Sequence, residues 1–171
     1  MKISFLTIYI IVIFISDSSL AQDKAEEHLN KGKVKYDLKH YRGAIIEFNK
    51  ALEINPEYIE AYISRGLAKS ELSGHKKAIL DFNKAIEINP NCVEAYVSRG
   101  KTKYKFRDYK GAIEDYSKAI EINPDEGNYF WERGNAKNKL GDNDGACIDW
   151  KKASALGKSE VNNLIKEFCK D

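Results

Sequence analysis

The feature that most constrains this chain is an internal repeat of 34 residues. Asn-Pro recurs at 55–56, 89–90 and 123–124, and Arg-Gly recurs at 65–66, 99–100 and 133–134. Alanines at 44, 78, 112 and 146 and aromatic residues at 48, 82, 116 and 150 keep the same register. The repeat therefore divides the chain into four units, at 25–58, 59–92, 93–126 and 127–160.

Each unit predicts a pair of helices. Apolar residues recur about every 3.6 positions in two stretches, which are separated by a short polar turn such as Ser73-Gly74-His75. The Asn-Pro pairs end the second helix, because proline cannot continue it and biases the preceding asparagine away from the α region. Each unit is thus expected to be a helical hairpin.

This pattern resembles the tetratricopeptide repeat family. Glycine occupies the eighth position of each unit, at 32, 66, 100 and 134, and the resemblance covers 136 of the 171 residues. It implies an all-α, right-handed solenoid of four helical hairpins. The spacing of Val161, Leu164, Ile165 and Phe168 predicts one further amphipathic helix over 161–171, which would cap the stack. The resemblance also implies a non-enzymatic scaffold that binds a peptide or protein segment in a concave groove.

The resemblance places positions 2, 5, 9, 12 and 13 of each unit along that groove. The last four of these positions give the candidate ligand-binding residues, which are Leu29, Lys33, Tyr36, Asp37, Ile63, Leu67, Ser70, Glu71, Val97, Lys101, Tyr104, Lys105, Trp131, Asn135, Asn138 and Lys139. An apolar strip, which a groove facing only water would not need, comprises Leu29, Ile63, Leu67 and Val97. Trp131 with Tyr104 is the candidate aromatic anchor, and packing of Trp131 against unit three is the alternative.

The charges of the groove suggest a ligand with unlike ends. Position 13 changes from acidic in Asp37 and Glu71 to basic in Lys105 and Lys139, which would give an extended ligand a preferred direction. Lys101 and Lys105 are like charges one helical turn apart, which suggests contact with an anion. An ordinary solvated face is the alternative to a binding groove.

Some relatives clamp the C-terminal carboxylate of cytosolic chaperones with Lys, Asn and Arg side chains. The corresponding residues here are Leu29, Lys33, Ser64, Val97 and Lys101. Only Lys101 is compatible with that role, so the resemblance does not extend to chaperone binding.

The units also predict ion pairs between their two helices. Position 7 reads Lys, Arg, Arg, Arg and position 23 reads Glu, Asp, Asp, Asp, so that the side-chain lengths compensate. The expected pairs are Lys31–Glu47, Arg65–Asp81, Arg99–Asp115 and Arg133–Asp149. Separate exposed charges are the alternative.

The first 21 residues predict a secretory signal peptide. Lys2 precedes an apolar run over 3–15. Ser19-Leu20-Ala21 then has the small-x-small pattern that a signal peptidase accepts as its cleavage site. As a helix the run spans about 20 Å, less than the ~30 Å hydrocarbon core, so a retained membrane anchor is the weaker alternative. We therefore expect a short linker at 22–24 and export to the periplasm or exterior of a bacterial cell, without a stable membrane span after cleavage.

Three cysteines remain in the exported part of the chain. If the cap packs on unit four, Cys147 and Cys169 can form a disulfide that closes a loop of about 22 residues. Two reduced, buried cysteines are the alternative. Cys92 is then left over, either as a packed thiol or as a link between chains.

No motif predicts catalysis, a metal site or a cofactor. The three histidines, at 28, 40 and 75, lack ligand partners at metal-binding spacing, and no phosphate loop or nucleophile motif occurs. The formal net charge is only +2, so no basic excess indicates nucleic-acid binding. The alternative to a peptide-binding scaffold is a structural subunit of a cell-envelope assembly that uses its convex or terminal surfaces.

Overall fold

A computed structural model describes residues 5–169 of the chain, with side chains from Leu20 onward. Within this range the regular structure is entirely helical, which confirms the all-α prediction. The helices are α1 Phe5–Asp37, α2 Tyr41–Ile54, α3 Ile59–Glu71, α4 His75–Ile88, α5 Val93–Lys105, α6 Tyr109–Ile122, α7 Gly127–Lys139, α8 Asn143–Ala155, the 3₁₀ helix η1 Ser159–Val161, and α9 Asn162–Phe168.

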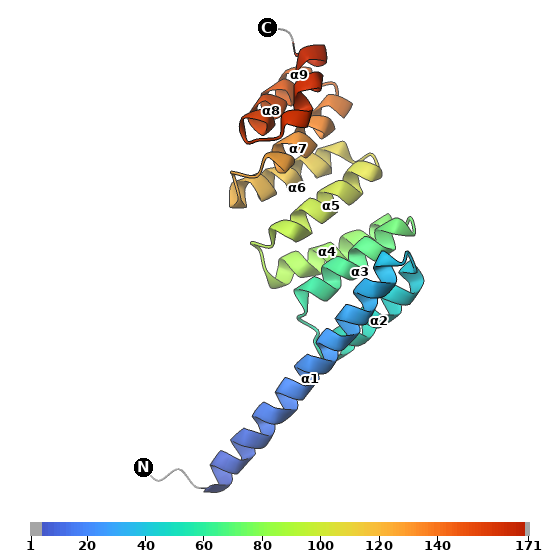
Figure 1. Ribbon diagram of the computed structural model, residues 1–171, viewed down its shortest axis with the longest axis vertical. Helices are drawn as coiled ribbons and strands as arrows, with labels where there is room; N and C mark the ends of the chain where they lie inside the picture. Colours follow the sequence, from blue (N-terminus) through green and yellow to red (C-terminus); the bar gives the residue numbers. More distant parts are fainter. Residues whose placement is uncertain (1–4, 170–171) are drawn as a thin grey trace.

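The helices form a solenoid of stacked hairpins. The pairs α1–α2, α3–α4, α5–α6 and α7–α8 follow one another along the long axis of the molecule, and the two termini lie at opposite ends of it (Figure 1). Each hairpin packs on the next mainly through its second helix, which lies against the first helix of the following unit. The stack therefore matches the predicted solenoid.

The Asn-Pro pairs end the second helices as expected. Asn55 is extended, with φ −125° and ψ 94°, and Asn89 and Asn123 have the same kind of backbone. The side chain of Asn55 accepts a hydrogen bond from the backbone N–H of Glu57 at 3.0 Å, and Asn89 does the same for Asn91. Asparagine therefore stabilises the turn that proline starts.

The turn inside each hairpin depends on one residue with left-handed backbone. Position 15 of each unit has a positive φ, at 60° for Lys39, 60° for Ser73, 65° for Arg107 and 84° for Gly141. Only the fourth unit has glycine there, the residue that adopts this conformation without a steric penalty. In the first three turns a residue other than glycine therefore adopts a left-handed backbone conformation that it does not intrinsically favour.

Close helix packing explains the glycine at position 8. A Cβ atom built on Gly66 would lie 2.7 Å from a ring carbon of Phe82, and one on Gly100 would lie 2.9 Å from a ring carbon of Tyr116. Both rings are fully buried, so they have little room to move. The aromatic residue at position 24 thus occupies space that only glycine leaves free.

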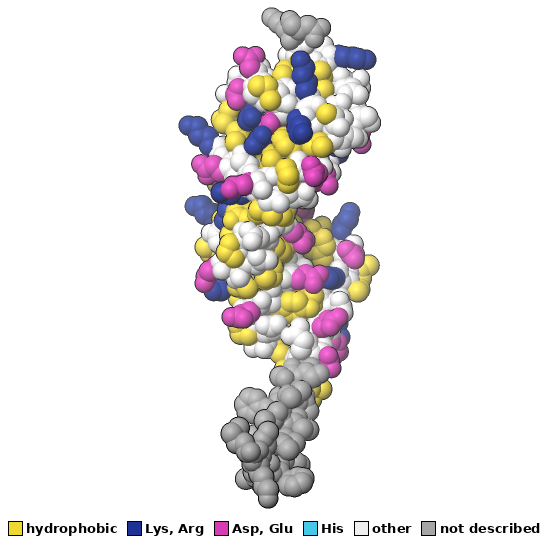
Figure 2. Space-filling model, turned by 90° about the vertical axis from the view of Figure 1, so that its left-hand side faces the viewer, with side chains coloured by type: hydrophobic (Ala, Val, Ile, Leu, Met, Phe, Trp, Pro, Cys, Tyr) yellow, Lys and Arg dark blue, Asp and Glu magenta, His cyan; other side chains and the backbone are white. Residues whose placement is uncertain are grey.

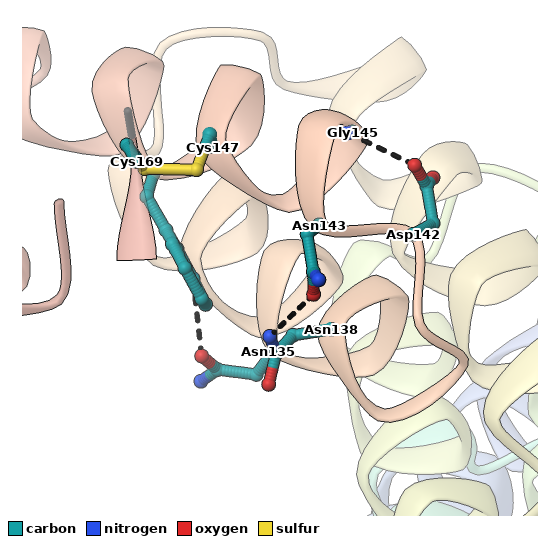
Figure 3. Close-up of a disulfide and its surroundings, with 8 residues drawn as sticks. Asn135, Asn138, Asp142, Asn143, Gly145, Cys147 and Cys169 are labelled. Atoms are coloured by element: carbon teal, nitrogen blue, oxygen red, sulfur yellow. Dashed lines mark hydrogen bonds between the residues drawn. A yellow bond between two sulfur atoms is a disulfide. The ribbon is translucent and has the colours of Figure 1, made fainter. Parts of the chain in front are cut away.

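The C-terminal end of the stack is covered. Val161 is fully buried and packs with Phe130 of α7 and Ala153 of α8, although it belongs to η1 and not to the capping helix itself. A disulfide joins Cys147 of α8 to Cys169, which follows α9, with the Cα atoms 5.6 Å apart (Figure 3). The cap is therefore attached both covalently and through apolar packing.

The N-terminal helix differs from the expected division of the chain. α1 is continuous through 22–24, so these residues form no separate linker. Residues 1–4 and the side chains up to residue 19, which make up most of the predicted signal peptide, lie outside the described part. Within that part, no helix combines the length and apolarity needed to cross a membrane.

Candidate functional site

The first helix of each hairpin carries the predicted groove residues, but their exposure varies widely. The fully or nearly buried ones are Leu29, Ile63 and Ser70. The half-buried ones are Lys33, Tyr36, Leu67, Val97, Tyr104, Trp131, Asn135 and Asn138. The exposed ones are Asp37, Glu71, Lys101, Lys105 and Lys139. The groove therefore has half-buried and exposed members in every unit.

The predicted apolar strip is wrong at two of its four positions. Leu29 packs in the core with Phe48, and Ile63 packs with Phe82, leaving 1% and 2% of each residue exposed. Position 5 lies at the edge of the packing face, so a long aliphatic side chain there reaches inward between the two helices of its unit. Leu67 and Val97 remain as the half-buried apolar members of the groove.

A cavity of about 160 Å³ opens between α1 and α3. Four of the predicted groove residues line it together with two that were not predicted, namely Lys33, Tyr36, Asp37, Leu67, Phe48 and Ser64. Phe48 reaches the cavity from α2 because its ring lies over Gly32, where no side chain blocks it. The pairing of Gly32 with Phe48 in the repeat was the sequence signal for this part of the lining.

The cavity has apolar walls and a charged rim. Tyr36 packs edge-to-face on Tyr41, with ring centroids 5.3 Å apart, and burial raises the pKa of its phenol. Lys33 donates a hydrogen bond to Glu60, which raises the pKa of the Lys33 ammonium. The carboxylate of Glu60 thereby balances the positive charge of Lys33. Within residues 20–169, Asp37 has no ion-pair partner. The rim thus has one uncompensated negative charge.

Two of the three basic residues farther along the groove, Lys101 and Lys105, already have acidic partners. Lys105 lies 3.1 Å from Glu71, one repeat earlier in the chain, and Lys101 lies 3.6 Å from Glu132 of the next unit. The like charges at 101 and 105 therefore face carboxylates of the same chain, and they give no reason to expect an external anion. Of the four residues at position 13, only Asp37 and Lys139 lack an ion-pair partner in the described range.

The two candidate aromatic anchors do not form one site. Tyr104 packs edge-to-face on Tyr109, with ring centroids 5.2 Å apart. Trp131 packs on the cluster under the cap, and the ammonium of Lys158 lies 4.8 Å from its ring centroid. Trp131 therefore packs mainly beneath the cap, with Ile120 as the one residue of unit three in the same cluster.

The two predicted groove asparagines of unit four form hydrogen bonds with other residues of the same unit. Asn135 accepts a hydrogen bond at 3.1 Å from the indole N–H of Trp150, and Asn138 donates one at 3.1 Å to Asn143 (Figure 3). These contacts fix the amide groups along the C-terminal end of the groove. The open cavity therefore lies at the opposite, N-terminal end.

Beneath the groove, each of units two to four contains the predicted ion pair. Arg65 and Asp81 form two parallel hydrogen bonds of 2.6 and 3.0 Å, and the pairs Arg99–Asp115 and Arg133–Asp149 repeat this arrangement. The prediction is wrong for unit one, where Lys31 pairs with Glu27. In units two to four the arginine at position 7 also donates to a side chain of the preceding hairpin. Within the described residues, no hairpin precedes unit one to hold Lys31 inward in this way.

The sequence reasoning missed a second cation at each carboxylate. Position 11 is lysine in every unit, and Lys69, Lys103 and Lys137 lie 2.7, 3.0 and 2.8 Å from the aspartate of their unit. In unit one Lys35 lies 2.6 Å from Glu47, and this contact together with a hydrogen bond to His28 lowers the pKa of Glu47 to about 2. The recurrence of lysine at this position was the signal that could have revealed it.

The described residues contain no cluster of His, Cys, Asp or Glu that could hold a metal ion. Figure 2 shows charged side chains of both signs dispersed over one face, with apolar surface between them.

Comparison with known proteins agrees with the repeat architecture. Sequence models described as tetratricopeptide repeat or TPR repeat match residues 32–73, 59–92 and 93–126, which together span more than half of the chain. No curated protein sequence matches the chain.

Solved structures share the fold. A crystal structure of MamA is 27% identical, with a TM-score of 0.74, and the match covers 80% of each chain. MamA from Desulfovibrio magneticus is 18% identical, with a TM-score of 0.76 over 84% of this chain and 82% of that one. The first TPR of Spaghetti (RPAP3), bound to the HSP90 peptide SRMEEVD, is 23% identical, with a TM-score of 0.67 over 70% of this chain and 95% of that one.

Proposed function

Because the chain belongs to the tetratricopeptide repeat family, we propose that it is an exported, non-enzymatic scaffold that binds a peptide or protein segment in the groove of its first helices. The observation that carries this proposal is the cavity between α1 and α3. It is the place where predicted groove residues from two adjacent units line one hollow.

The lining indicates which segment would bind. Tyr36, Phe48 and Leu67 give the cavity an apolar interior, and a volume of about 160 Å³ suits one aliphatic or aromatic side chain. Asp37 lies at the rim and has no ion-pair partner in the described range, so a Lys or Arg next to the apolar residue of the ligand would be favoured. We therefore expect an apolar residue flanked by a basic one.

One structural relative supports peptide binding as the mode. That domain holds an HSP90 peptide, and its likeness to this chain concerns the fold. The residues at the positions with which relatives clamp a terminal carboxylate differ here, since Leu29 is buried and Lys33 pairs with Glu60. The ligand of this chain would therefore be selected by its apolar side chain and not by a chain terminus.

The experiment is a selection from a displayed library of short random peptides, followed by fluorescence anisotropy with one selected peptide. Leu67→Glu places a charge in the cavity and is expected to weaken binding about tenfold or more. Leu80→Glu is the matched control, because Leu80 is 65% exposed on α4 and does not line the cavity. Equal binding by both variants, each checked by circular dichroism, would overturn the proposal.

A second variant tests the rim without touching the core. Asp37→Lys lies on the exposed surface, and it should weaken peptides that carry a basic residue while leaving the fold intact. The loss should diminish at high salt, because the contact is electrostatic. An unchanged affinity at low salt would show that Asp37 takes no part.

The alternative function is a structural subunit of an envelope assembly that uses the second helices. Its supporting observation is a set of exposed aliphatic residues at position 22, namely Ile46, Leu80 and Ile148, at 55%, 65% and 68% exposure. Under this alternative Leu80→Glu would disrupt the assembly, whereas Leu67→Glu would leave it intact. The same pair of variants therefore distinguishes the two functions.

Export is tested separately from binding. A reporter enzyme that is active only outside the cytoplasm, fused after Asp171, should be active, and N-terminal sequencing of the recovered protein should begin at Gln22. A protein that retains Met1 and stays in the cytoplasm would contradict export. Recovery of the intact chain from membranes would favour the retained anchor.

A further inference from the structure

The turns inside the first three hairpins gather basic side chains that have no acidic partner. Between Ala25 and Asn138, all but six of the Lys and Arg side chains form ion pairs. The six exceptions are all exposed, and they are Lys39, Arg42, Lys76, Lys77, Arg107 and Lys110. They lie where the first helix of a hairpin ends and the second begins, in the segments 38–42, 72–77 and 106–110, which we call the basic edge.

The basic edge lies opposite an acidic side of the solenoid. The turns inside the first three hairpins lie on one side of the stack, and the Asn-Pro connections lie on the other (Figure 1). The basic edge contains one acidic residue, Asp108, whereas eight acidic residues and no basic one occur in the connecting segments 53–60, 87–94 and 121–128. Of the two carboxylates that border the edge, Glu71 is paired with Lys105, and Asp37 is unpaired within residues 20–169. The hairpin-turn side is therefore the one that attracts anions.

Each turn of the basic edge also exposes one large apolar side chain. Leu38, Leu72 and Phe106 occupy position 14 of their units and are 62%, 43% and 54% exposed. The ring centroids of His75 and Phe106 lie 5.7 Å apart, so the second and third turns contact each other. A hollow of about 370 Å³ beside this contact is lined by the Phe106 ring and by two of the unpaired lysines. The basic edge thus presents a row of apolar tips with cations around them.

We propose that the basic edge is a docking surface for a lipid bilayer that carries anionic headgroups. The phosphate groups of such a bilayer neutralise the unpaired cations, and the hydrocarbon beneath them receives the apolar tips. A bilayer presents these two layers uniformly along its surface, which matches the repetition of one apolar tip and two cations in three consecutive turns. A folded protein partner would instead need an acidic and an apolar group at the correct spacing for each of the three turns.

The fourth hairpin does not continue this surface. Leu140 occupies position 14 there and is 45% exposed, but Asp144 occupies position 18, where the other three hairpins have a basic residue. The bilayer therefore contacts hairpins one to three and not the capped end. The groove also stays apart from it, because none of the cavity-lining residues belongs to the basic edge. Binding to a bilayer and binding of a peptide can thus be tested independently.

The test is cosedimentation of residues 22–171 with lipid vesicles. The vesicles contain either equal parts of phosphatidylglycerol and phosphatidylcholine or phosphatidylcholine alone. Residues 1–21 are omitted because their apolar run would itself enter lipid, and the shorter chain retains all the named core residues, which lie between Ala25 and Val161. The proposal predicts binding to the anionic vesicles, at least about tenfold weaker binding to the neutral ones, and a loss of affinity at high salt.

Charge reversal shows whether the basic edge is the surface that binds. Lys76→Glu with Lys77→Glu should weaken binding to the anionic vesicles at least about tenfold. Lys151→Glu with Lys166→Glu is the matched control, because it changes the net charge equally at exposed positions of α8 and α9, and its effect should be much smaller. Absence of binding to the anionic vesicles, equal binding to both kinds of vesicle, or an equal loss in both double variants would overturn the proposal.

Removal of the apolar tips distinguishes a bilayer from other anionic partners. Leu72→Ser with Phe106→Ser leaves the charge unchanged and should also weaken binding to the anionic vesicles. Leu80→Ser with Ile148→Ser is the control, because these residues are at least as exposed but lie on α4 and α8. Each variant is checked for its fold by circular dichroism. Binding that survives the loss of the tips would indicate a general attraction to anions, as for an acidic polypeptide, and would overturn docking on a bilayer.

Discussion

Arg99 binds three partners on three helices with one guanidinium group. Its Nε and Nη2 donate to Asp115 of α6, its Nη1 donates to Asn83 of α4 in the preceding unit, and its guanidinium carbon lies 5.4 Å from the ring centroid of Tyr96 on its own helix. Arg65 and Arg133 repeat the arrangement, with Ser117 accepting from Arg133 in place of asparagine. Each arginine therefore links two consecutive units as well as the two helices of its own hairpin.

Arg99→Lys should destabilise the chain by about 1–2 kcal/mol, because an ammonium group cannot form the two parallel bonds and also reach the preceding unit. Asp115 is nearly buried, so water cannot take the place of the guanidinium as a hydrogen-bond donor to its carboxylate. Urea unfolding followed by circular dichroism measures the destabilisation. Lys31→Ala is the control at the same position of unit one and should change stability by less than about 0.5 kcal/mol, since its pair with Glu27 is exposed.

Because the turn residues have left-handed backbone, removing glycine from one turn should lower stability, whereas introducing glycine into another should not. Gly141→Ala should cost about 1 kcal/mol, because φ is 84° there and no atom lies within 4 Å of the added carbon, so that backbone strain alone acts. Arg107→Gly, at a φ of 65°, should be neutral or stabilising by up to about 0.5 kcal/mol. Thermal unfolding of both variants checks the signs. A destabilising Arg107→Gly would show that the arginine side chain contributes more than its backbone costs.

The disulfide predicts that stability depends on oxidation at the C-terminal end. Cys147→Ser with Cys169→Ser should lower the free energy of unfolding by about 2–3 kcal/mol, as expected for a loop of 22 residues. Cys92→Ser should have little effect. If a reductant lowers the melting temperature of the double serine variant as much as that of the natural chain, the disulfide is not the cause.

Unit one should lose stability at acidic pH. Lys35, with His28, holds the pKa of Glu47 at about 2, below its ordinary value of 4.5. A depressed carboxylate pKa stabilises the fold fully above about 4.5, and that contribution disappears as the pH falls toward about 2. Glu47→Gln should therefore be less stable than the natural chain near neutral pH, and the difference should shrink across this window. A constant difference over the window would exclude this linkage.

The architecture could be predicted because the constraints recur. The same packing contact, between glycine at position 8 and an aromatic residue at position 24, recurs in all four units. Likewise, an Asn-Pro pair marks the end of the second helix in three units. The ion pairs were predictable for the same reason. Unit one departs because no hairpin precedes it in the described part of the chain, and the identity of Lys31 alone does not reveal this.

The groove was harder to predict because position alone does not decide exposure. Leu29 and Ile63 have the same register as Val97 and Trp131, yet their side chains reach into the core. The ion pair of Lys105 with Glu71 requires contact between residues 34 positions apart, and a charge pattern that looked directed toward a ligand proved to be internal. Sequence reasoning located four of the residues that line the cavity, but it missed Phe48 and Ser64. It also missed the carboxylates that pair with Lys33, Lys101 and Lys105.

The most direct test of the central claim is photocrosslinking inside the cells that make the protein. A photoreactive amino acid replaces Ser64, which lines the cavity, or Leu80, which lies exposed on α4. The account predicts a discrete crosslink to an exported polypeptide from position 64, which disappears when Leu67→Glu is added, and no such crosslink from position 80. A crosslink from position 80 alone would contradict binding in the groove and would favour the second helices as the working surface.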